Sequence, residues 1–361
     1  MQNRQNSETS KRIAVVIPVY NSRRYLIQTV ESIFNQSYQK IDIVLVDDGS
    51  TDGSSLLCDE LSNQHANIKV FHQNNSGVAK ARNLALEYIC AGNNDYLYIA
   101  FLDADDIWKN EWIDKQIIEL MNQNFDLIGL QSSFCNHLAT RRSDVSPLLE
   151  GKYKGGVSSI WIHAKQHIGA MLYRVGFIKQ YDLRFYNIKT SEDKIFSMQC
   201  LYLADNIYCI NKLMHLYRQN NNSLVHTREK GIPYFFPIID AYIQSDIEMA
   251  KYRNSIRGYL CEGEVLAKSY IMDMIEEELE SYSGEERLKK FFENRNDYLY
   301  ILEKSTQNKQ VNDRWTYIKE HKNKIIIKNR VYSLLFNIIR KLYHIQPMKF
   351  IIDLKRYPIK M

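Results

Sequence analysis

Six consecutive residues, Phe-Leu-Asp-Ala-Asp-Asp at 101–106, place three carboxylates within four positions. Like charges this close repel one another, and a folded protein tolerates them best when a cation lies between them. Carboxylates are also the groups through which proteins hold Mg²⁺ together with phosphate oxygens. The hexapeptide therefore predicts a site where a divalent cation and a phosphate group meet.

The segment that leads into these acids is an apolar run that we predict to be a buried strand. It is one of several such runs, with helical spacing of apolar residues between them. We expect strands at Ile13–Val19, Ile43–Val46, Ile68–Phe71, Tyr96–Leu102 and Leu127–Leu130. This alternation predicts an α/β fold with a mostly parallel sheet and flanking helices. Ligands of such sheets bind just beyond the carboxyl ends of the strands.

The first strand ends in Pro18-Val19-Tyr20-Asn21. Proline stops the ladder, and Tyr20 offers a flat face on which a nucleotide base can stack. The alternative is an ordinary strand-to-helix turn in which Asn21 or Ser22 caps the next helix.

The second strand runs into Asp47-Asp48. A carboxylate at this place can accept the N–H of a pyrimidine ring, whereas the alternative is a turn capped by Thr51 or Asp52. The spacing from Asp48 also imitates an EF-hand loop. We reject that interpretation because position twelve is Asp59 instead of glutamate and a strand precedes the loop.

The segment after the third strand is Asn74-Asn75-Ser76-Gly77, followed by Lys80 and Arg82. Gly77 lets the backbone approach a ligand, and Arg82 can pair with phosphate. Taken alone, the segment is equally a solvated helix start.

A further acidic pair, Glu192-Asp193, follows Ser191. A serine N-cap with acids in the first turn is a favourable helix start. The same pair could instead supply a catalytic carboxylate, and the local sequence does not separate the two interpretations.

After about residue 135 the alternation breaks. Ile168–Tyr173 and Ile207–Tyr217 predict strands of a mixed extension, with a helix at about 193–204 between them. From about residue 227 onward the pattern is mainly helical.

In combination these segments are more specific than any one of them. IPVYN, VDDGSTD, NNSGVAKARN, FLDADD and SEDKIF follow one another in this order, and the series resembles the family 2 glycosyltransferases of the GT-A fold. The resemblance covers about residues 12–225. It implies inverting transfer of a sugar from a nucleotide-sugar, usually UDP-linked, to a hydroxyl of a glycan acceptor.

The resemblance assigns roles to individual positions of this sequence. It implies that Tyr20 stacks on the base, Asp48 bonds the uracil edge, Asp103 lies near the ribose, and Asp105 is the main protein ligand of Mn²⁺ or Mg²⁺. The implied nucleotide-sugar-binding set is Pro18, Tyr20, Asn21, Asp47, Asp48, Gly77, Arg82, Asp103 and Ala104.

The remaining roles fall in the second half of the chain. Asp193, beside Glu192, is implied to be the general base that takes the proton of the acceptor hydroxyl. His167 or Gly169 is expected to line the sugar pocket, and Arg218 to reach the diphosphate or the acceptor.

Departures from related patterns narrow the prediction. The processive synthases of the family carry a Gln-x-x-Arg-Trp motif and membrane helices, and this sequence has neither, which favours single-sugar addition. A nucleotidyltransferase or dehydrogenase needs a glycine-rich phosphate loop, and Ile13–Ser22 contains no glycine. A non-catalytic, membrane-associated scaffold that keeps the nucleotide-sugar-binding fold is the alternative function.

The net charge of +5 is unevenly distributed. Residues 321–361 contain ten Lys or Arg and a single acid, Asp353. Within them, apolar residues from Val331 to Leu342 recur at helical spacing opposite basic ones. Such a helix can lie on an anionic bilayer. The alternative is a helix docked on its own domain, and we expect no nucleic-acid partner because no known module accompanies the charge.

The chain is expected to be cytoplasmic and peripheral on the inner face of the cell membrane. Its six cysteines show no CxxC spacing, its first dozen residues lack a signal-peptide core, and no run of 18 apolar residues occurs. We predict four regions: a disordered tail at 1–11, the glycosyltransferase domain at 12–225 (nucleotide half 12–130, acceptor half 131–225), a helical region at 226–320 and the basic tail at 321–361.

Overall fold

The structure is a computed structural model. It describes residues 12–91, 95–136, 138, 140–145, 150–155 and 168–219, and six further positions between 241 and 252. The predicted disordered tail at 1–11, His167, nearly all of the helical region and the basic tail at 321–361 lie outside the described residues.

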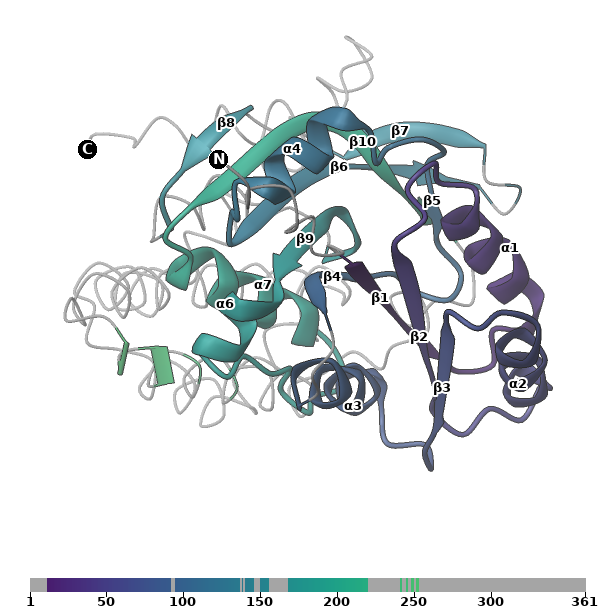
Figure 1. The fold of residues 1–361 in the computed structure, drawn as a ribbon. Coiled ribbons are helices and arrows are strands. Elements are labelled where there is room, and N and C mark those ends of the chain that lie inside the picture. Colours follow the sequence, from purple (N-terminus) through teal and green to yellow (C-terminus); the bar gives the residue numbers. More distant parts are fainter. Residues whose placement is uncertain are drawn as a thin grey trace, which may run out of the picture. The chain divides into compact units, whose positions relative to one another are not determined.

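The predicted α/β fold is confirmed. A 10-stranded sheet runs through the described part of the chain in the order β3-β2-β1-β4-β9-β6-β10-β5, with β7 beside β6 and β8 beside β10 (Figure 1). The strands are β1 Arg12–Val19, β2 Ile41–Asp47, β3 Ile68–His72, β4 Tyr96–Phe101, β5 Ile107–Trp108, β6 Leu127–Cys135, β7 Arg141–Val145, β8 Gly151–Tyr153, β9 Met171–Arg174 and β10 Ile207–Arg218.

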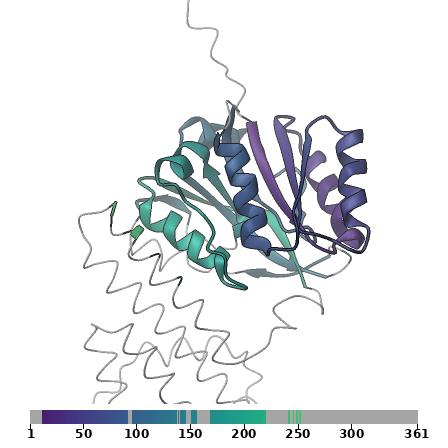
Figure 2. The same cartoon turned by 90° about the horizontal axis from the view of Figure 1, so that it is seen from below.

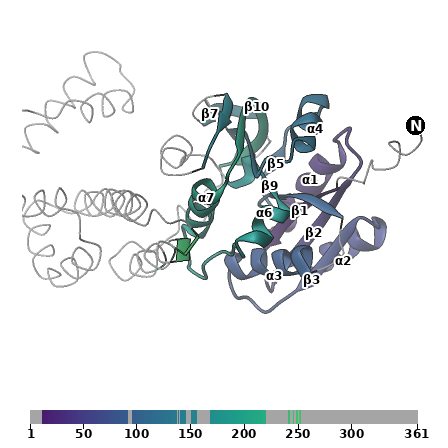
Figure 3. The same ribbon diagram turned by 60° about the vertical axis from the view of Figure 1, so that its left-hand side comes forward.

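Helices cover both faces of this sheet. They are α1 Arg23–Phe34, α2 Ser54–Gln64, α3 Val78–Ala91, α4 Lys115–Asn122, α6 Val175–Gln180 and α7 Glu192–Leu203, with a short 3₁₀ turn at Ile168–Ala170. Helices α1, α2 and α4 pack on one face, and α3, α6 and α7 on the other (Figure 3). Figure 2 shows α3, in blue, beside the teal segment of α6 and α7. None of the described helices is long and apolar enough to cross a bilayer.

The alternation of apolar residues along β1 explains the layers. Ile13, Val15 and Ile17 contribute to the core beneath α1, α2 and α4, while Ala14 and Val16 contribute to the core beneath α3. Successive side chains of a strand point to opposite faces, so a strand covered by helices on both sides must be apolar at every position.

Strand β1 lies between β2 and β4 and pairs with both in parallel. From β1 the chain moves outward through β2 and β3, and then returns to add β4 on the other side of β1. The carboxyl ends of β1, β2 and β4 therefore meet where the strand order reverses, which is where α/β sheets bind ligands.

The second half of the sheet is mixed, as the sequence predicts. β9 is antiparallel to β4 and β6, whereas β10 is parallel to β6. The predicted strand at Ile168–Tyr173 begins as the 3₁₀ turn and becomes β9 only at Met171. Strands β5, β7 and β8 are short and are not anticipated from the sequence. β5 matters most, because it pairs with β10 directly after the acidic hexapeptide.

Candidate active site

The loops after β1 and β2 hold each other in place. Tyr20 follows β1 with half of its surface exposed. The next residue, Asn21, has a positive φ of 49°, and its Oδ1 accepts the backbone N–H of Thr51 at 2.8 Å. Of the two residues expected to cap α1, Asn21 and Ser22, Ser22 occupies the N-cap position, but its side chain makes no capping bond and its hydroxyl donates to the Tyr20 carbonyl. The turn thus presents the Tyr20 ring to solvent at the sheet edge.

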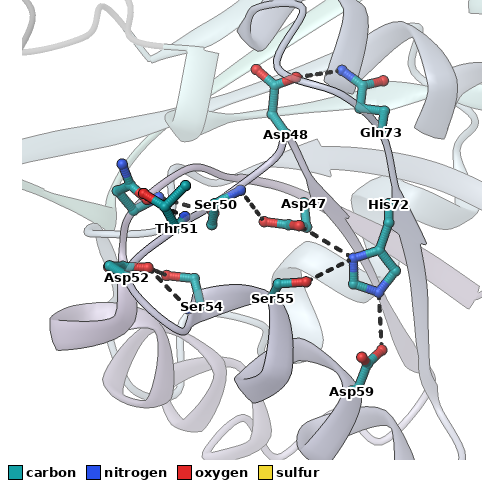
Figure 4. Close-up of polar contacts among 11 residues, drawn as sticks. Asp47, Asp48, Ser50, Thr51, Asp52, Ser54, Ser55, Asp59, His72 and Gln73 are labelled. Atoms are coloured by element: carbon teal, nitrogen blue, oxygen red, sulfur yellow. Dashed lines mark hydrogen bonds and ion pairs between the residues drawn. The ribbon is translucent and has the colours of Figure 1, made fainter.

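Asp48 is buried and ties the end of β2 to the loop after β3. Its Oδ1 accepts Gln73 Nε2 and Ser76 N, both at 2.7 Å, and its Oδ2 accepts Gly77 N at 2.9 Å. The bond to Gln73 is drawn in Figure 4. Gly77 has a φ of +94°, a conformation that favours glycine. A carboxylate offers about four lone-pair sites, and three are used here.

Its neighbour Asp47 faces a different set of groups. One oxygen accepts Ser50 N, and the other lies 3.2 Å from His72 Nδ1, while His72 Nε2 lies 3.0 Å from Asp59 on α2 (Figure 4). Burial alone would lower the pKa of His72, but the two carboxylates raise it above its ordinary value. Burial would raise the pKa of Asp47, and hydrogen bonds from Ser50 and His72 lower it instead.

The three acids of the hexapeptide lie in three different environments. Asp103 is one-third exposed and accepts Arg82 NH2 at 2.7 Å. Asp106 is fully buried and contacts His215 Nε2 at 2.8 Å and the backbone N–H of Arg218 at 2.8 Å. Asp105 is partly buried, and its backbone carbonyl accepts Arg218 Nε at 2.5 Å. Residues of β10 therefore hold the Asp106 side chain, and Arg82 of α3 holds the Asp103 side chain.

His215 on β10 is fully buried beneath this turn. Burial lowers its pKa to about 4. We therefore assign a neutral ring that donates from Nε2 to Asp106 and accepts the Ser132 hydroxyl at Nδ1, 2.8 Å away. A Cβ on Gly169 would lie 2.8 Å from His215 Nε2, so the glycine leaves the room that this ring occupies.

Arg82 on α3 reaches two separate carboxylates. NH2 binds Asp103, and NH1 binds Glu192 Oε1 at 2.8 Å. Glu192 is the first residue of α7, and Ser191 occupies the N-cap position as predicted. Ser191 has a left-handed φ of 67°, and its side chain makes no capping bond. The neighbouring Asp193 is partly buried and accepts the N–H of Lys194 at 2.8 Å.

The remaining predicted site residues lie as follows. Pro18 is within β1 and pairs with Val46. Ala104 is buried, and its carbonyl accepts the Thr29 hydroxyl at 2.9 Å. Arg218 is 1% exposed, donates to Gln28 at 2.8 Å, and lies over the Tyr25 ring. In this structure Arg218 binds the Asp105 carbonyl of the acidic turn, and Gly169 leaves room for His215, which contacts Asp106.

A divalent cation fits this arrangement in one way. Among the residues that the structure describes, no group of three or more His, Cys, Asp or Glu is arranged to hold a metal. Asp106 is turned to His215, and Asp103 to Arg82. Mg²⁺ is usually held by one or two carboxylates together with substrate phosphates and waters. Asp105 fits such a site, in which a single carboxylate holds the cation and phosphate oxygens and waters supply the other ligands.

Sequence reasoning missed several residues that shape the site. His215 lies 109 positions from its partner Asp106, and Thr29 lies 75 positions from the Ala104 carbonyl that it binds. Ser132 contacts His215 across 83 positions. No local pattern marks such contacts. His72 is different, because it ends β3 directly beside the Asp47 strand end and could have been found from strand order.

Comparison with known proteins finds sequence relatives of one enzyme family. The profile of the family described as "Glycosyl transferase family 2" matches residues 14–181. "Glycosyltransferase GlyG" of Streptococcus pneumoniae serotype 4 is 29% identical over 237 residues, which cover 60% of this chain and 74% of GlyG. An uncharacterized glycosyltransferase of Haemophilus influenzae is 34% identical over 198 residues, 52% of this chain and 71% of that protein.

Among solved structures, S. aureus TarS 1–349 in complex with UDP-GlcNAc has the same fold. The TM-score is 0.54 at 20% identity, and the match covers 69% of this chain and 75% of that one.

Proposed function

The chain belongs to glycosyltransferase family 2, and from that premise we propose that it transfers a single sugar from a UDP-sugar to a hydroxyl of a glycan acceptor with inversion. The observation that carries the proposal is the meeting of three strand ends. Tyr20, Asp48 and the acids Asp103 and Asp105 follow β1, β2 and β4 respectively at one edge of the sheet. The Arg82 contacts join that edge to Glu192-Asp193. A complex of the fold neighbour TarS with UDP-GlcNAc supports a nucleotide-sugar donor.

The nucleoside is recognised at the ends of β1 and β2. The exposed face of Tyr20 stacks on the base. Asp48 has one lone-pair site left after its three hydrogen bonds, and it accepts the N–H of uracil there. An acceptor for the ring N–H of uracil, next to a stacking ring, favours a pyrimidine over a purine.

The diphosphate lies beyond β4. Asp103 is near the ribose, and Asp105 is the residue that holds Mn²⁺ or Mg²⁺ together with phosphate oxygens. When bound, that cation neutralises negative charge on the leaving diphosphate.

The acceptor is activated from α7. Asp193 takes the proton from the acceptor hydroxyl as that oxygen attacks the anomeric carbon. The bond from that carbon to the diphosphate oxygen breaks with its electron pair, and UDP leaves from the opposite face. The configuration at the sugar is inverted by this single displacement.

The acceptor is a lipid-linked oligosaccharide of a cell-surface polysaccharide such as a capsule or lipopolysaccharide, and the enzyme is peripheral on the inner face of the membrane. The support for this setting is the basic, amphipathic pattern of residues 321–361.

A panel of UDP-sugars with Mn²⁺ tests the proposal by measuring the release of UDP. We expect Asp105→Ala and Asp193→Asn each to lower kcat by roughly 10²–10⁴-fold. Only Asp105→Ala should also weaken UDP binding in the presence of Mn²⁺. Asp182→Asn is the matched control, because this exposed acid has a positive φ that asparagine tolerates.

Two outcomes contradict the proposal. Normal turnover by Asp105→Ala or Asp193→Asn rules out the assigned roles. Binding of UDP by the wild type without release or transfer from any UDP-sugar favours the alternative function, a membrane-associated scaffold that keeps the nucleotide-sugar-binding fold.

A further inference from the structure

We propose that Arg82 and Glu192 touch neither donor nor acceptor, and that they form a buried bridge which positions Asp193 against the acidic turn after β4. The inference rests on the proposed function, in which Asp193 is the base. It gives both residues a role other than the nucleotide contact and the catalytic role that the sequence predicts for them.

The geometry of the bridge joins three distant segments. Arg82 on α3 donates through NH2 to Asp103 Oδ1 at 2.7 Å and through NH1 to Glu192 Oε1 at 2.8 Å. Asp103 follows β4, and Glu192 is the first residue of α7. The bridge therefore connects the donor edge of the sheet to the helix end that carries Asp193.

The guanidinium is turned inward on every side. Arg82 is 3% exposed, and its Nε has no hydrogen-bond partner within the described residues. Its Cζ lies 5.3 Å from the centre of the Phe185 ring. That ring stacks on Phe196 of α7 at 4.1 Å, with only 10° between the ring planes. Both terminal nitrogens of the arginine thus bind carboxylates, one face of the guanidinium contacts an aromatic ring, and only 3% of the residue is exposed to an approaching phosphate.

The charges favour the same arrangement. Burial alone would lower the pKa of Arg82, but the carboxylates of Asp103, Glu192 and Asp193 raise it, so the arginine stays charged. Burial raises the pKa of Glu192, and Arg82 is the group that opposes this shift. Removing one member leaves a buried charge without its partner, which is strongly unfavourable.

The consequence for the reaction is a fixed distance between the base and the donor. Ser191 has a left-handed backbone, so the start of α7 is held in a conformation that its own sequence disfavours. The bridge supplies the contact that holds it. A displacement of about 1 Å at a reacting group can cost about 10²-fold in rate.

A double-mutant cycle on kcat tests the bridge. Arg82→Met and Glu192→Gln should each lower kcat by about 10²-fold. Because both variants remove the ion pair of the same bridge, the double variant should also lose about 10²-fold instead of the 10⁴-fold expected for independent sites. Lys115→Met removes an exposed cation from α4 and is the control. Arg82→Lys keeps the charge but reaches only one carboxylate, so we expect partial rescue.

The UDP affinity separates positioning from ligand contact. Under the inference, the Kd for UDP changes less than about 3-fold in Glu192→Gln and Arg82→Met, while kcat falls. A phosphate contact by Arg82 would instead be worth roughly 10-fold or more in Kd. Such a loss, or effects on kcat that multiply in the double variant, would overturn the inference and leave the proposed function intact.

A readout without turnover completes the test. Hydrogen exchange of the Lys194 and Ile195 amides reports on the first turn of α7, where both amides are hydrogen bonded. We expect at least 10-fold faster exchange in Glu192→Gln and in Arg82→Met, with melting curves showing that each variant is folded. Unchanged exchange contradicts the bridge even if the wild type transfers no sugar, and Glu192→Gln decides the result if Arg82→Met does not fold.

Discussion

Residues with the same side chain differ in this site because their neighbours differ. Asp103, Asp105 and Asp106 span four positions, yet one meets an arginine, one is partly buried, and one is fully buried against a neutral histidine. The pair Asp47 and Asp48 divides in the same way, because one faces His72 and the other accepts loop amides. An acid therefore acquires its role from the groups that reach it.

His72 offers a prediction at this scale. Its pKa lies above the ordinary 6.5 because Asp47 and Asp59 stabilise the protonated ring. A raised pKa stabilises the fold below the unfolded value of 6.5, and this contribution disappears as the pH rises through the folded value. An NMR titration should show that Asp59→Asn lowers the His72 pKa, whereas Glu60→Gln, an exposed neighbour on α2, leaves it unchanged. Equal titration curves for Asp59→Asn and the wild type would contradict the assigned contact.

Single elements bring these groups together over long stretches of chain. β10 pairs with both β6 and β5, and it carries His215 and Arg218 beneath the acidic turn. The short β5 follows that turn directly, so its pairing with β10 fixes where the turn ends. One late strand thus supports a motif that lies about 110 residues earlier in the chain.

The close approach at Gly169 gives a prediction for this element. Gly169→Ala would place its Cβ 2.8 Å from His215 Nε2, and the ring is pinned by Asp106 and Ser132. Overpacking of this kind costs about 1–3 kcal/mol. Thermal melting should show the loss, together with lower transfer activity.

Gly176→Ala is the matched control for that substitution. Gly176 is exposed on α6, and its added Cβ meets only the guanidinium of Arg174, with NH1 at 2.8 Å and Cζ at 3.9 Å, the far end of a flexible side chain. Alanine is the better helix former by about 0.5–1 kcal/mol, so Tm should be unchanged or higher. A Gly169→Ala protein as stable as Gly176→Ala would show that the His215 ring moves freely.

At the scale of the whole molecule, one half of the described chain presents strand ends, and the other half contributes the proposed base and the groups that support the acidic turn. The parallel half, β1 to β4, ends in Tyr20, Asp48 and Asp103, and the mixed half brings α7 with Asp193. Because helices cover both faces of the sheet, the strands are apolar along their length. Polar side chains are therefore found at the carboxyl ends of the strands, where α/β sheets bind ligands. The excess of positive charge in the chain lies elsewhere in the sequence, in residues 321–361.

The basic tail gives a prediction for the full chain. Deletion of 321–361 should move the protein from the membrane fraction to the soluble fraction, because about 1 kcal/mol per basic residue near an anionic surface is lost. Replacing Arg330, Arg340 and Lys341 by glutamine keeps the apolar stripe and should give an intermediate distribution. Fractionation of cells expressing each form measures this, and an unchanged distribution of the deleted form contradicts membrane association through the tail.

The sequence by itself determined the fold class, the strands of the parallel half and the order of the motifs at their ends. Apolar periodicity and strand-end position are local properties, so Tyr20, Asp48 and the hexapeptide could be found without coordinates. It placed Asn21 or Ser22 at the N-cap of α1 and Ser191 at the N-cap of α7, but could not predict that neither serine side chain makes a capping bond, because the backbone conformation there depends on the surrounding contacts.

Only the tertiary structure decided which polar groups meet. Arg82 contacts Glu192 across 110 positions, and His215 contacts Asp106 across 109. Neither contact follows from spacing, because each depends on where helices and strands far apart in the chain pack. These contacts and the burial around them set the charge of each group: nearby carboxylates keep Arg82 charged although burial opposes it, and burial makes His215 neutral.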